Sequence, residues 1–345
     1  MGNRLEEFKG RFQNVLLDFL WRQWSSLGMA GYPQMSDAWI IDPEALLCCT
    51  CILGRLDSRL FDETLDWLRE NGGLLHLSRL KSISEIPELE CKRTLSAMAL
   101  HLGNKAGTQK WKALVLDSNG PENPAPFFSK AGQVPPSLQP DRHFASQGWL
   151  RGQFNFSGKS AKASGNGSSN LLIRMRSLFG VNARAEIITY LLRYGSGHPH
   201  EIARKTHYFV KTVQDALVQM RDSGLIRVRS EAGRKIYSLE REAWKPLLFP
   251  SNDIPEFFDW PLIFCTLIAL WSELDAEGFK EASDLYQSAK LKSWARAAYP
   301  LLEGSGLEVT LRQESGFNGE AFLPIFIEDM EKLFGALSGA SIPNP

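Results

Sequence analysis

Side chains that can bind nucleic acid gather between residues 204 and 235 of this chain. Guanidinium and ammonium groups bind phosphate oxygens, and lysine, amide and hydroxyl groups can also hydrogen-bond to base edges. A helix over about 209–223 would carry one set of them, and a basic hairpin over 226–239 and the end of the preceding helix would carry the rest. The candidate contact residues are Arg204, Lys205, Tyr208, Lys211, Thr212, Gln214, Arg227, Arg229, Arg234 and Lys235.

The spacing of apolar residues predicts three helices around these positions. Residues 183–192 carry one apolar face, and Asn182 precedes them as an available N-cap. Pro199 suits the first turn of a second helix, because the N–H that proline lacks would be unpaired there. In the third helix an apolar stripe recurs at intervals of three, four and three from Val210 to Met220.

A hairpin is expected directly after the third helix. Gly224 stands where a helix C-terminus favours a left-handed residue. Two basic runs then alternate in character around Glu231-Ala232-Gly233, which indicates a tight turn between two strands. Three helices followed by a basic hairpin are the order expected of a winged helix, which presents one helix to the DNA major groove and a hairpin beside it.

Residues 182–240 resemble the DNA-binding domains of winged-helix bacterial regulators of the MarR and ArsR type. The resemblance lies in EIARKT, in VKTVQDALVQMRDSGLI and in the basic hairpin, and it covers about one sixth of the chain. It implies double-stranded DNA as the partner, a role in transcription regulation, and a homodimer on a palindromic site.

Two features depart from that pattern. The turn before the third helix, Thr206 to Phe209, is bulky where such families usually have small polar residues, and Asp215 lies on the proposed DNA face. A carboxylate there repels phosphate unless it accepts a hydrogen bond from a cytosine amine. The alternative is a winged helix that binds protein: a non-enzymatic adaptor or antitoxin-like subunit whose acidic helical domains contact a protein partner.

The charge distribution favours a nucleic-acid partner although the whole chain has a formal net charge of +0. Residues 171–240 carry twelve Lys and Arg against six Asp and Glu, and residues 71–170 carry the same balance. Residues 1–70 have seven against eleven, and residues 241–345 have eight against sixteen. A basic middle between acidic ends is typical of a chain with one region that faces nucleic acid.

Composition and pattern predict a mainly α protein with a small β-wing, divided into four parts. Its 345 residues, 43% of them hydrophobic and 23% charged, suffice for two or three globular domains. The expected parts are a helical N-terminal domain over 1–117, a Pro/Gly/Ser-rich linker over 118–170, the winged helix over 171–243, and an acidic helical domain over 244–345.

The sequence lacks convincing motifs for a membrane segment, a cofactor site or a catalytic site. The first residues lack the apolar core of a signal peptide, and the longest apolar run, Trp260 to Trp271, is too short to cross a bilayer, so we expect a cytoplasmic protein without membrane contact. Gly158-Lys159-Ser160 lacks the earlier glycine, the strand and the helix of a phosphate-binding loop.

The cysteines and histidines do not predict a metal site either. Cys48, Cys49 and Cys51 lie on an apolar helix, where a role as small hydrophobes outweighs metal or redox sensing. His198, His200 and His207 surround the second helix, where solvated turn residues or phosphate donors are favoured over a metal or pH-sensing site. We therefore expect a protein that is not an enzyme and binds no cofactor or metal.

Overall fold

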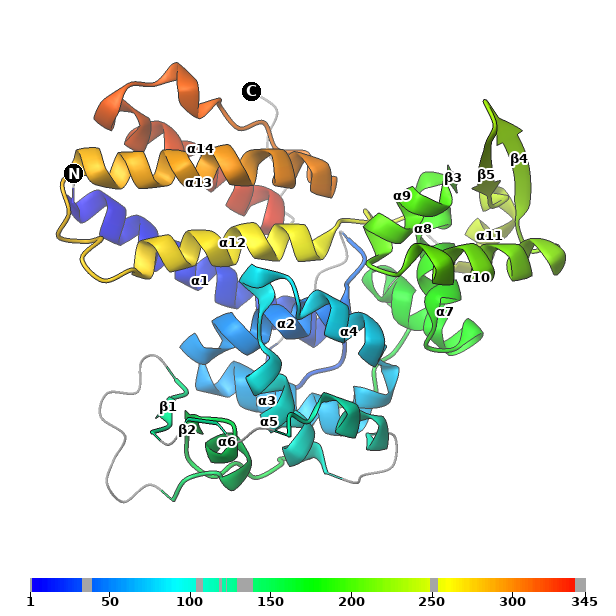
Figure 1. Ribbon diagram of the computed structural model, residues 1–345, viewed down its shortest axis with the longest axis horizontal. Helices are drawn as coiled ribbons and strands as arrows, with labels where there is room; N and C mark the ends of the chain where they lie inside the picture. The colour runs from blue at the N-terminus through cyan, green and yellow to red at the C-terminus, as the bar shows by residue number, and fades with distance from the viewer. Residues whose placement is uncertain are drawn as a thin grey trace. The chain divides into compact units, whose positions relative to one another are not determined.

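The computed structural model describes residues 2–32, 39–103, 108–117, 120–121, 123–128, 139–248 and 254–338. The described chain is mainly helical and has one small antiparallel sheet, as the sequence predicted, together with a short parallel strand pair (Figure 1). It divides into two compact units, residues 1–21 with 258–345 and residues 22–257. Helix α1 (Gly2–Ser26) begins in the first unit and ends in the second.

The first unit is a set of helices packed through aromatic side chains. The start of α1 contributes Phe8 and Phe12, whose rings lie 5.5 Å from Phe326 and 5.3 Å from Phe334, both on α14. Helices α12 and α13 pack against each other along their lengths (Figure 1). The helices after α1 are α12 (Trp260–Asp275), α13 (Asp284–Ser305) and α14 (Phe322–Ser338).

The first half of the second unit is a layer of short helices. Asp42 caps the first of them, since its carboxylate accepts a hydrogen bond from the Ala45 N–H at 3.1 Å. The indole N–H of Trp67 donates to the Leu27 carbonyl at 2.7 Å and joins this layer to the end of α1. The elements are α2 (Pro43–Leu53), α3 (Ser58–Asn71), α4 (Leu77–Ile83), α5 (Lys92–Leu102), β1 (Ala125–Pro126), α6 (Arg142–Ser146) and β2 (Trp149–Leu150).

Part of the segment predicted as a linker, residues 158–163, is hydrogen-bonded to α3. The carboxylate of Asp66 accepts the backbone N–H groups of Gly158 at 2.8 Å, Lys159 at 3.1 Å and Ser160 at 3.2 Å. The side chain of Asn71 extends the contact to Ala161 and Ala163. The Gly/Ser-rich composition predicted a flexible tether. In the structure, side chains of α3 instead form hydrogen bonds with the backbone of this segment. Residues 118–119, 122 and 129–138 of that prediction lie outside the described residues.

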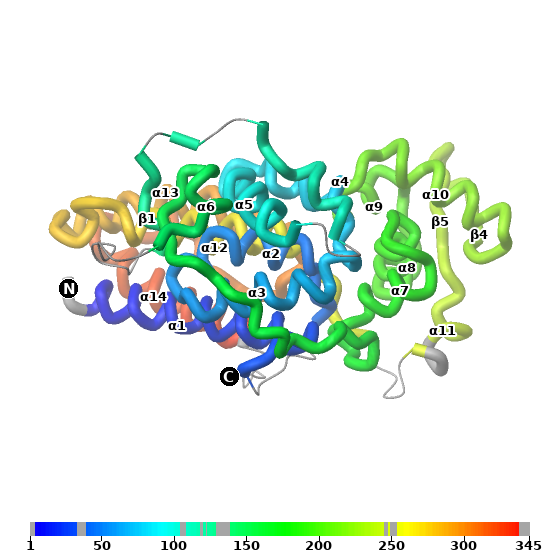
Figure 2. The backbone as a smooth tube through the Cα atoms, turned by 90° about the horizontal axis from the view of Figure 1, so that it is seen from below, coloured from blue at the N-terminus to red at the C-terminus, as the bar shows by residue number. Residues whose placement is uncertain are grey.

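The second half of the unit holds the segment that the sequence singled out. Its sheet is antiparallel in the order β3-β5-β4, and the hairpin register pairs Glu231 with Arg234. Figure 2 shows its helices, α7 to α10, gathered together. The buried core of this part includes Ile187, Leu191 and Leu217. The elements are α7 (Leu171–Phe179), α8 (Ala183–Tyr194), β3 (Ser196–Gly197), α9 (Pro199–Thr206), α10 (Val210–Asp222), β4 (Arg227–Glu231), β5 (Arg234–Ser238) and α11 (Arg241–Leu248).

The two compact units do not coincide with the four predicted domains. The prediction separated the N-terminal residues from the C-terminal helices, whereas the first 21 residues share a unit with residues 258–345. Residues 22–117 share the other unit with the α7–β5 segment. No helix among the described residues is long and apolar enough to cross a membrane.

Candidate nucleic-acid interface

Helix α10 buries one stripe and exposes the polar face that the sequence predicted. Val213, Leu217 and Met220 are at most 2% exposed, because they lie on the core side of the helix. Lys211 and Gln214 are exposed on the other side. Thr212 is exposed there as well. The helix therefore offers solvent a row of ammonium, hydroxyl and amide groups over its first turn and a half.

Asp215 is partly neutralised on this face. The Lys211 ammonium lies 2.7 Å from the Asp215 carboxylate, and their side chains are 79% and 53% exposed. An ion pair this exposed contributes only about 0–1 kcal/mol, so the lysine can exchange it for another anion or acceptor at small cost. While the pair is formed, it reduces the repulsion that an isolated aspartate would exert on phosphate.

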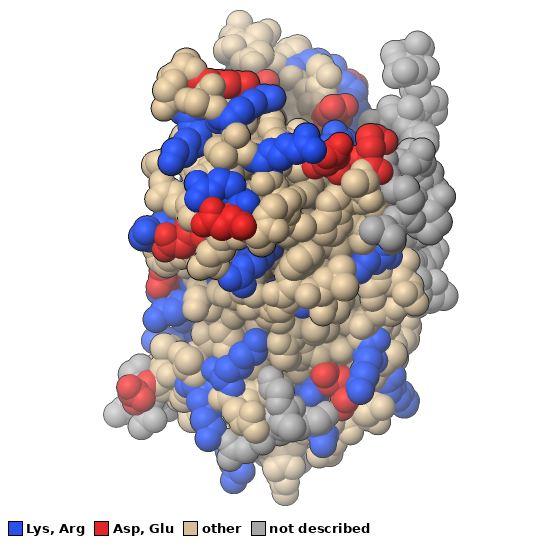
Figure 3. Space-filling model, turned by 90° about the vertical axis from the view of Figure 1, so that its right-hand side faces the viewer, with Lys and Arg blue, Asp and Glu red and all other residues tan. Residues whose placement is uncertain are grey.

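The hairpin of β4 and β5 presents four basic side chains. Its two-residue turn, Ala232 and Gly233, has φ of 47° and 77°, the left-handed values that the tight hairpin turn requires. Arg227, Arg229, Arg234 and Lys235 are all exposed. Figure 3 shows the side of the molecule that carries α10 and the hairpin, where Lys and Arg side chains are spread among fewer acidic ones.

Two of these arginines have acidic neighbours. Arg227 pairs with Glu240 at 2.6 Å, and Arg229 pairs with Glu231 at 2.7 Å. All four side chains are more than half exposed, so both pairs are weak in water and leave the guanidinium groups accessible to phosphate.

The end of α9 carries two more of the predicted residues. Arg204 is exposed and Lys205 is half-buried. The helix begins at Pro199 with His198 as its cap, whose ring nitrogen accepts from the His200 N–H at 3.3 Å. His198 therefore has a structural role at the start of α9.

Tyr208 was predicted to contact DNA from the exposed face, and the structure contradicts that prediction. Its hydroxyl is buried and has no hydrogen-bond partner among the described residues. Its ring lies 5.1 Å from the ring of His76, and burial raises the pKa of the phenol. The residue follows α9 in a turn that is not helical, so the helical spacing used for the exposed face does not apply to it.

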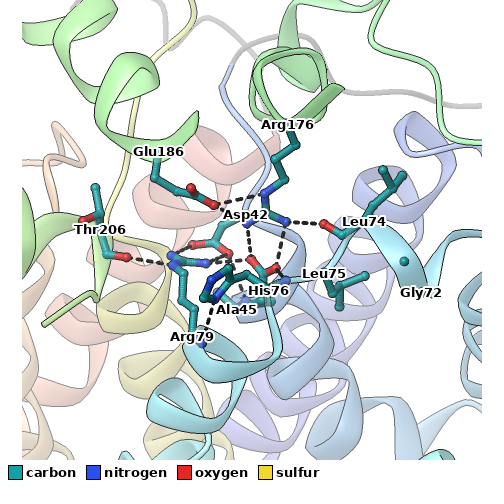
Figure 4. Close-up of polar contacts among 12 residues, drawn as sticks. Asp42, Ala45, Gly72, Leu74, Leu75, His76, Arg79, Arg176, Glu186 and Thr206 are labelled. Atoms are coloured by element: carbon teal, nitrogen blue, oxygen red, sulfur yellow. Dashed lines mark hydrogen bonds and ion pairs between the residues drawn. The ribbon is translucent and has the colours of Figure 1, made fainter. Parts of the chain in front are cut away.

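A buried ion cluster that no sequence pattern predicted lies behind this turn (Figure 4). Glu44 on α2 accepts two hydrogen bonds from Arg176 on α7, both at 2.7 Å, and one from Arg79 on α4 at 2.8 Å. Arg176 also reaches Glu186 on α8 at 2.5 Å, and Arg79 is paired with Asp42. The Glu44 and Arg176 side chains are both 0% exposed.

The cluster remains ionised because its members compensate each other. Burial alone would raise the pKa of Glu44, but the charges of Arg176 and Arg79 outweigh it and hold that pKa below its usual value. For Arg176, burial lowers the pKa, and Glu44 and Glu186 more than reverse that effect. The arrangement is therefore a set of fixed charges inside the unit.

This cluster positions the turn that leads into α10. The Arg79 Nε donates to the Thr206 carbonyl, the last residue of α9, at 2.7 Å. Arg79 itself is only 3% exposed and is held by Asp42 and Glu44. The end of α9, and with it the entry to α10, is thus tied to α2 and α4. Residues 44 and 176 are too far apart in the chain for periodicity or spacing to reveal the pairing.

Hydrogen bonds from Cys48 and Cys51 lower the pKa of the Cys91 thiol to about 5. All five cysteines are buried. The described residues contain no group of three or more His, Cys, Asp or Glu side chains arranged to hold a metal ion.

Comparison of the chain with family models, with curated proteins and with solved structures finds no match.

Proposed function

We propose that residues 171–243 form a winged helix that binds double-stranded DNA in a sequence-specific manner. The carrying observation is that α10 exposes a polar, partly basic face beside an exposed basic hairpin, while Val213, Leu217 and Met220 of its apolar stripe are buried. A recognition helix needs both properties, because it must pack on the domain and present hydrogen-bonding groups to the groove.

The order of elements supports the fold assignment. Helices α8, α9 and α10 precede the β4–β5 hairpin, and β3, between α8 and α9, completes a sheet in the order β3-β5-β4. Three helices with a hairpin at the end of a small antiparallel sheet are the elements of the winged helix-turn-helix. In this arrangement α10 is the recognition helix and the hairpin is the wing.

The chemistry of α10 suits the major groove. With 13 residues, α10 is about 20 Å long, enough to lie along several base pairs. Gln214 can form a paired hydrogen bond with adenine and Lys211 can donate to guanine, while Thr212 can contact a thymine methyl or a phosphate. Asp215 suits a cytosine amine.

The basic residues around α10 suit the phosphate backbone. Arg204 and Lys205 would contact phosphates at one side of the groove, and the four basic residues of the hairpin at the other. Such contacts give affinity with little sequence preference, and each makes binding more sensitive to salt.

We also propose that the protein regulates transcription. It would act in the cytoplasm as a homodimer. Two copies related by a two-fold axis would place two α10 helices on half-sites about one turn of DNA apart. The site selected by the protein would then be a palindrome.

The test is selection of binding sites from a random duplex pool by the full-length protein. We expect enrichment of one palindromic sequence, and we expect Lys211→Ala with Gln214→Ala to lose the preference for it by about tenfold or more, since each base contact gives about 1–3 kcal/mol of discrimination. The matched control is Gln109→Ala with Lys112→Ala, an exposed glutamine and lysine at the same spacing outside the site. A pool that stays random after selection would contradict the proposal.

A protein-binding adaptor is the second candidate, and one observation in the first unit favours it. Leu285 and Tyr286 are 57% and 51% exposed at the start of α13, and Tyr286 lines an open cavity of about 450 Å³ with Phe279. Adjacent exposed apolar side chains beside a cavity are typical of a contact surface. If the protein is such an adaptor, Leu285→Ala with Tyr286→Ala should weaken capture of its protein partner and leave DNA selection unchanged.

A further inference from the structure

The bulky turn before α10 sends its two aromatic side chains in opposite directions. Tyr208 points inward and contacts His76, whereas Phe209 is 74% exposed. Among the large apolar side chains of the described residues, Phe209 has the highest exposed fraction. His207, in the left-handed conformation with φ of 56°, ends α9 just before them.

Neither packing nor capping accounts for a phenylalanine at this position. Phe209 is the N-cap residue of α10 and its side chain makes no capping hydrogen bond. Serine, threonine, aspartate or asparagine would stabilise the helix there by about 1 kcal/mol more. A large exposed ring at the start of a helix also loses the free energy that its burial would provide. The ring is therefore available to a ligand.

The surroundings of the ring indicate what that ligand is. Lys211 and Thr212 are exposed in the first turn of α10, directly after Phe209. The N-terminal residues of a recognition helix are the ones that reach base edges. An apolar group among donors and acceptors in the major groove matches thymine, which presents a methyl group beside its O4 acceptor.

We infer that Phe209 contacts the 5-methyl group of a thymine in the major groove and makes the protein prefer A·T at that step. This inference rests on the proposed DNA binding and deepens it, since it assigns a specificity-determining residue. Two contacts hold the turn before Phe209: Arg79 donates to the Thr206 carbonyl at 2.7 Å, and the Tyr208 ring packs 5.1 Å from the ring of His76.

The experiment removes only the methyl group from the DNA. The duplex selected by the wild-type protein is remade with deoxyuridine at each thymine in turn, which leaves base pairing and O4 intact. We expect one position per half-site at which wild-type affinity falls by roughly threefold to tenfold, the effect of losing one buried methyl contact. Phe209→Ala should bind the thymine and deoxyuridine duplexes equally, and Phe209→Leu should keep part of the difference.

A second exposed apolar residue provides the control. Leu178 on α7 is 62% exposed and lies outside α10 and the hairpin, so Leu178→Ala should discriminate as the wild type does. Circular dichroism of each variant should match the wild type, because the replaced side chains are exposed.

The outcomes separate this inference from the proposal that it builds on. Selective DNA binding without any effect of deoxyuridine would overturn the role of Phe209 and leave DNA recognition intact. Equal weakening of Phe209→Ala on both duplexes, with the methyl effect retained, would also overturn it. Failure of the wild type to select any DNA would refute the proposed function, and the inference with it.

Discussion

Arg176 shows at the scale of one residue how burial changes the meaning of a charge. Counted along the chain, it adds to the basic character of residues 171–240. In the structure it is enclosed by Glu44 and Glu186 and contributes nothing to the surface. The positive surface of this region therefore comes from fewer residues than the count implies.

Replacement of Arg176 by methionine should destabilise the protein strongly. The change leaves Glu44 and Glu186 buried without their main counter-ion, and breaking such a pair costs about 3–5 kcal/mol. Urea unfolding followed by tryptophan fluorescence measures the loss. Arg227→Ala breaks an exposed pair with Glu240 and should cost less than about 1 kcal/mol. Equal losses in the two variants would show that the cluster does not hold the unit together.

The directions of the Tyr208 and Phe209 side chains could not be predicted from the sequence. Both are aromatic and adjacent, and sequence alone favoured Tyr208 as the exposed contact. The direction of each side chain depends on where α9 ends and on the partners that α4 supplies, neither of which the local pattern contains. The exposed basic and polar residues of α10 and the hairpin were predictable, because burial of an amphipathic helix determines its outer face.

At the scale of elements, local signals predicted much of the α8–β5 segment. Asn182 caps α8 by accepting from the Arg184 N–H at 2.9 Å, and Gly224 follows α10 with φ of 76°, both as expected. Helix α7 and the long-range contacts of residues 139–170 were not predicted. Their stability depends on partners distant in the chain, such as Asp66 on α3.

The turn of the β4–β5 hairpin contains a strained residue whose replacement should stabilise the protein. Ala232 adopts φ of 47°, where an alanine side chain is strained, whereas asparagine tolerates this conformation and is preferred before glycine in such turns. Ala232→Asn should stabilise the protein by about 0.5–1 kcal/mol. Thermal unfolding monitored by circular dichroism would detect the gain, and Ser230→Asn, at an exposed position in β4, serves as the control. A lower midpoint for Ala232→Asn than for the wild type would contradict the turn geometry.

At the scale of the whole molecule, the chain does not fold as consecutive domains. The first 21 residues join residues 258–345, because the aromatic face of α1 is covered by α12 and α14. Periodicity showed that α1 has a broad apolar face, but not which segment would cover it. Residues 22–117 likewise share a unit with the proposed winged helix, so its orientation and stability depend on helices that precede it by more than a hundred residues.

If α10 and the hairpin bind duplex DNA, that binding must depend steeply on salt. The affinity of the full-length protein for the selected duplex is measured across a salt series, beside Arg234→Ala with Lys235→Ala. We expect a steep loss of wild-type affinity with salt and a slope reduced by about two in the variant, one for each lost phosphate contact. Lys92→Ala with Arg93→Ala, a basic pair at the start of α5, should keep the wild-type slope. An unchanged slope in the hairpin variant, or wild-type binding insensitive to salt, would contradict the account.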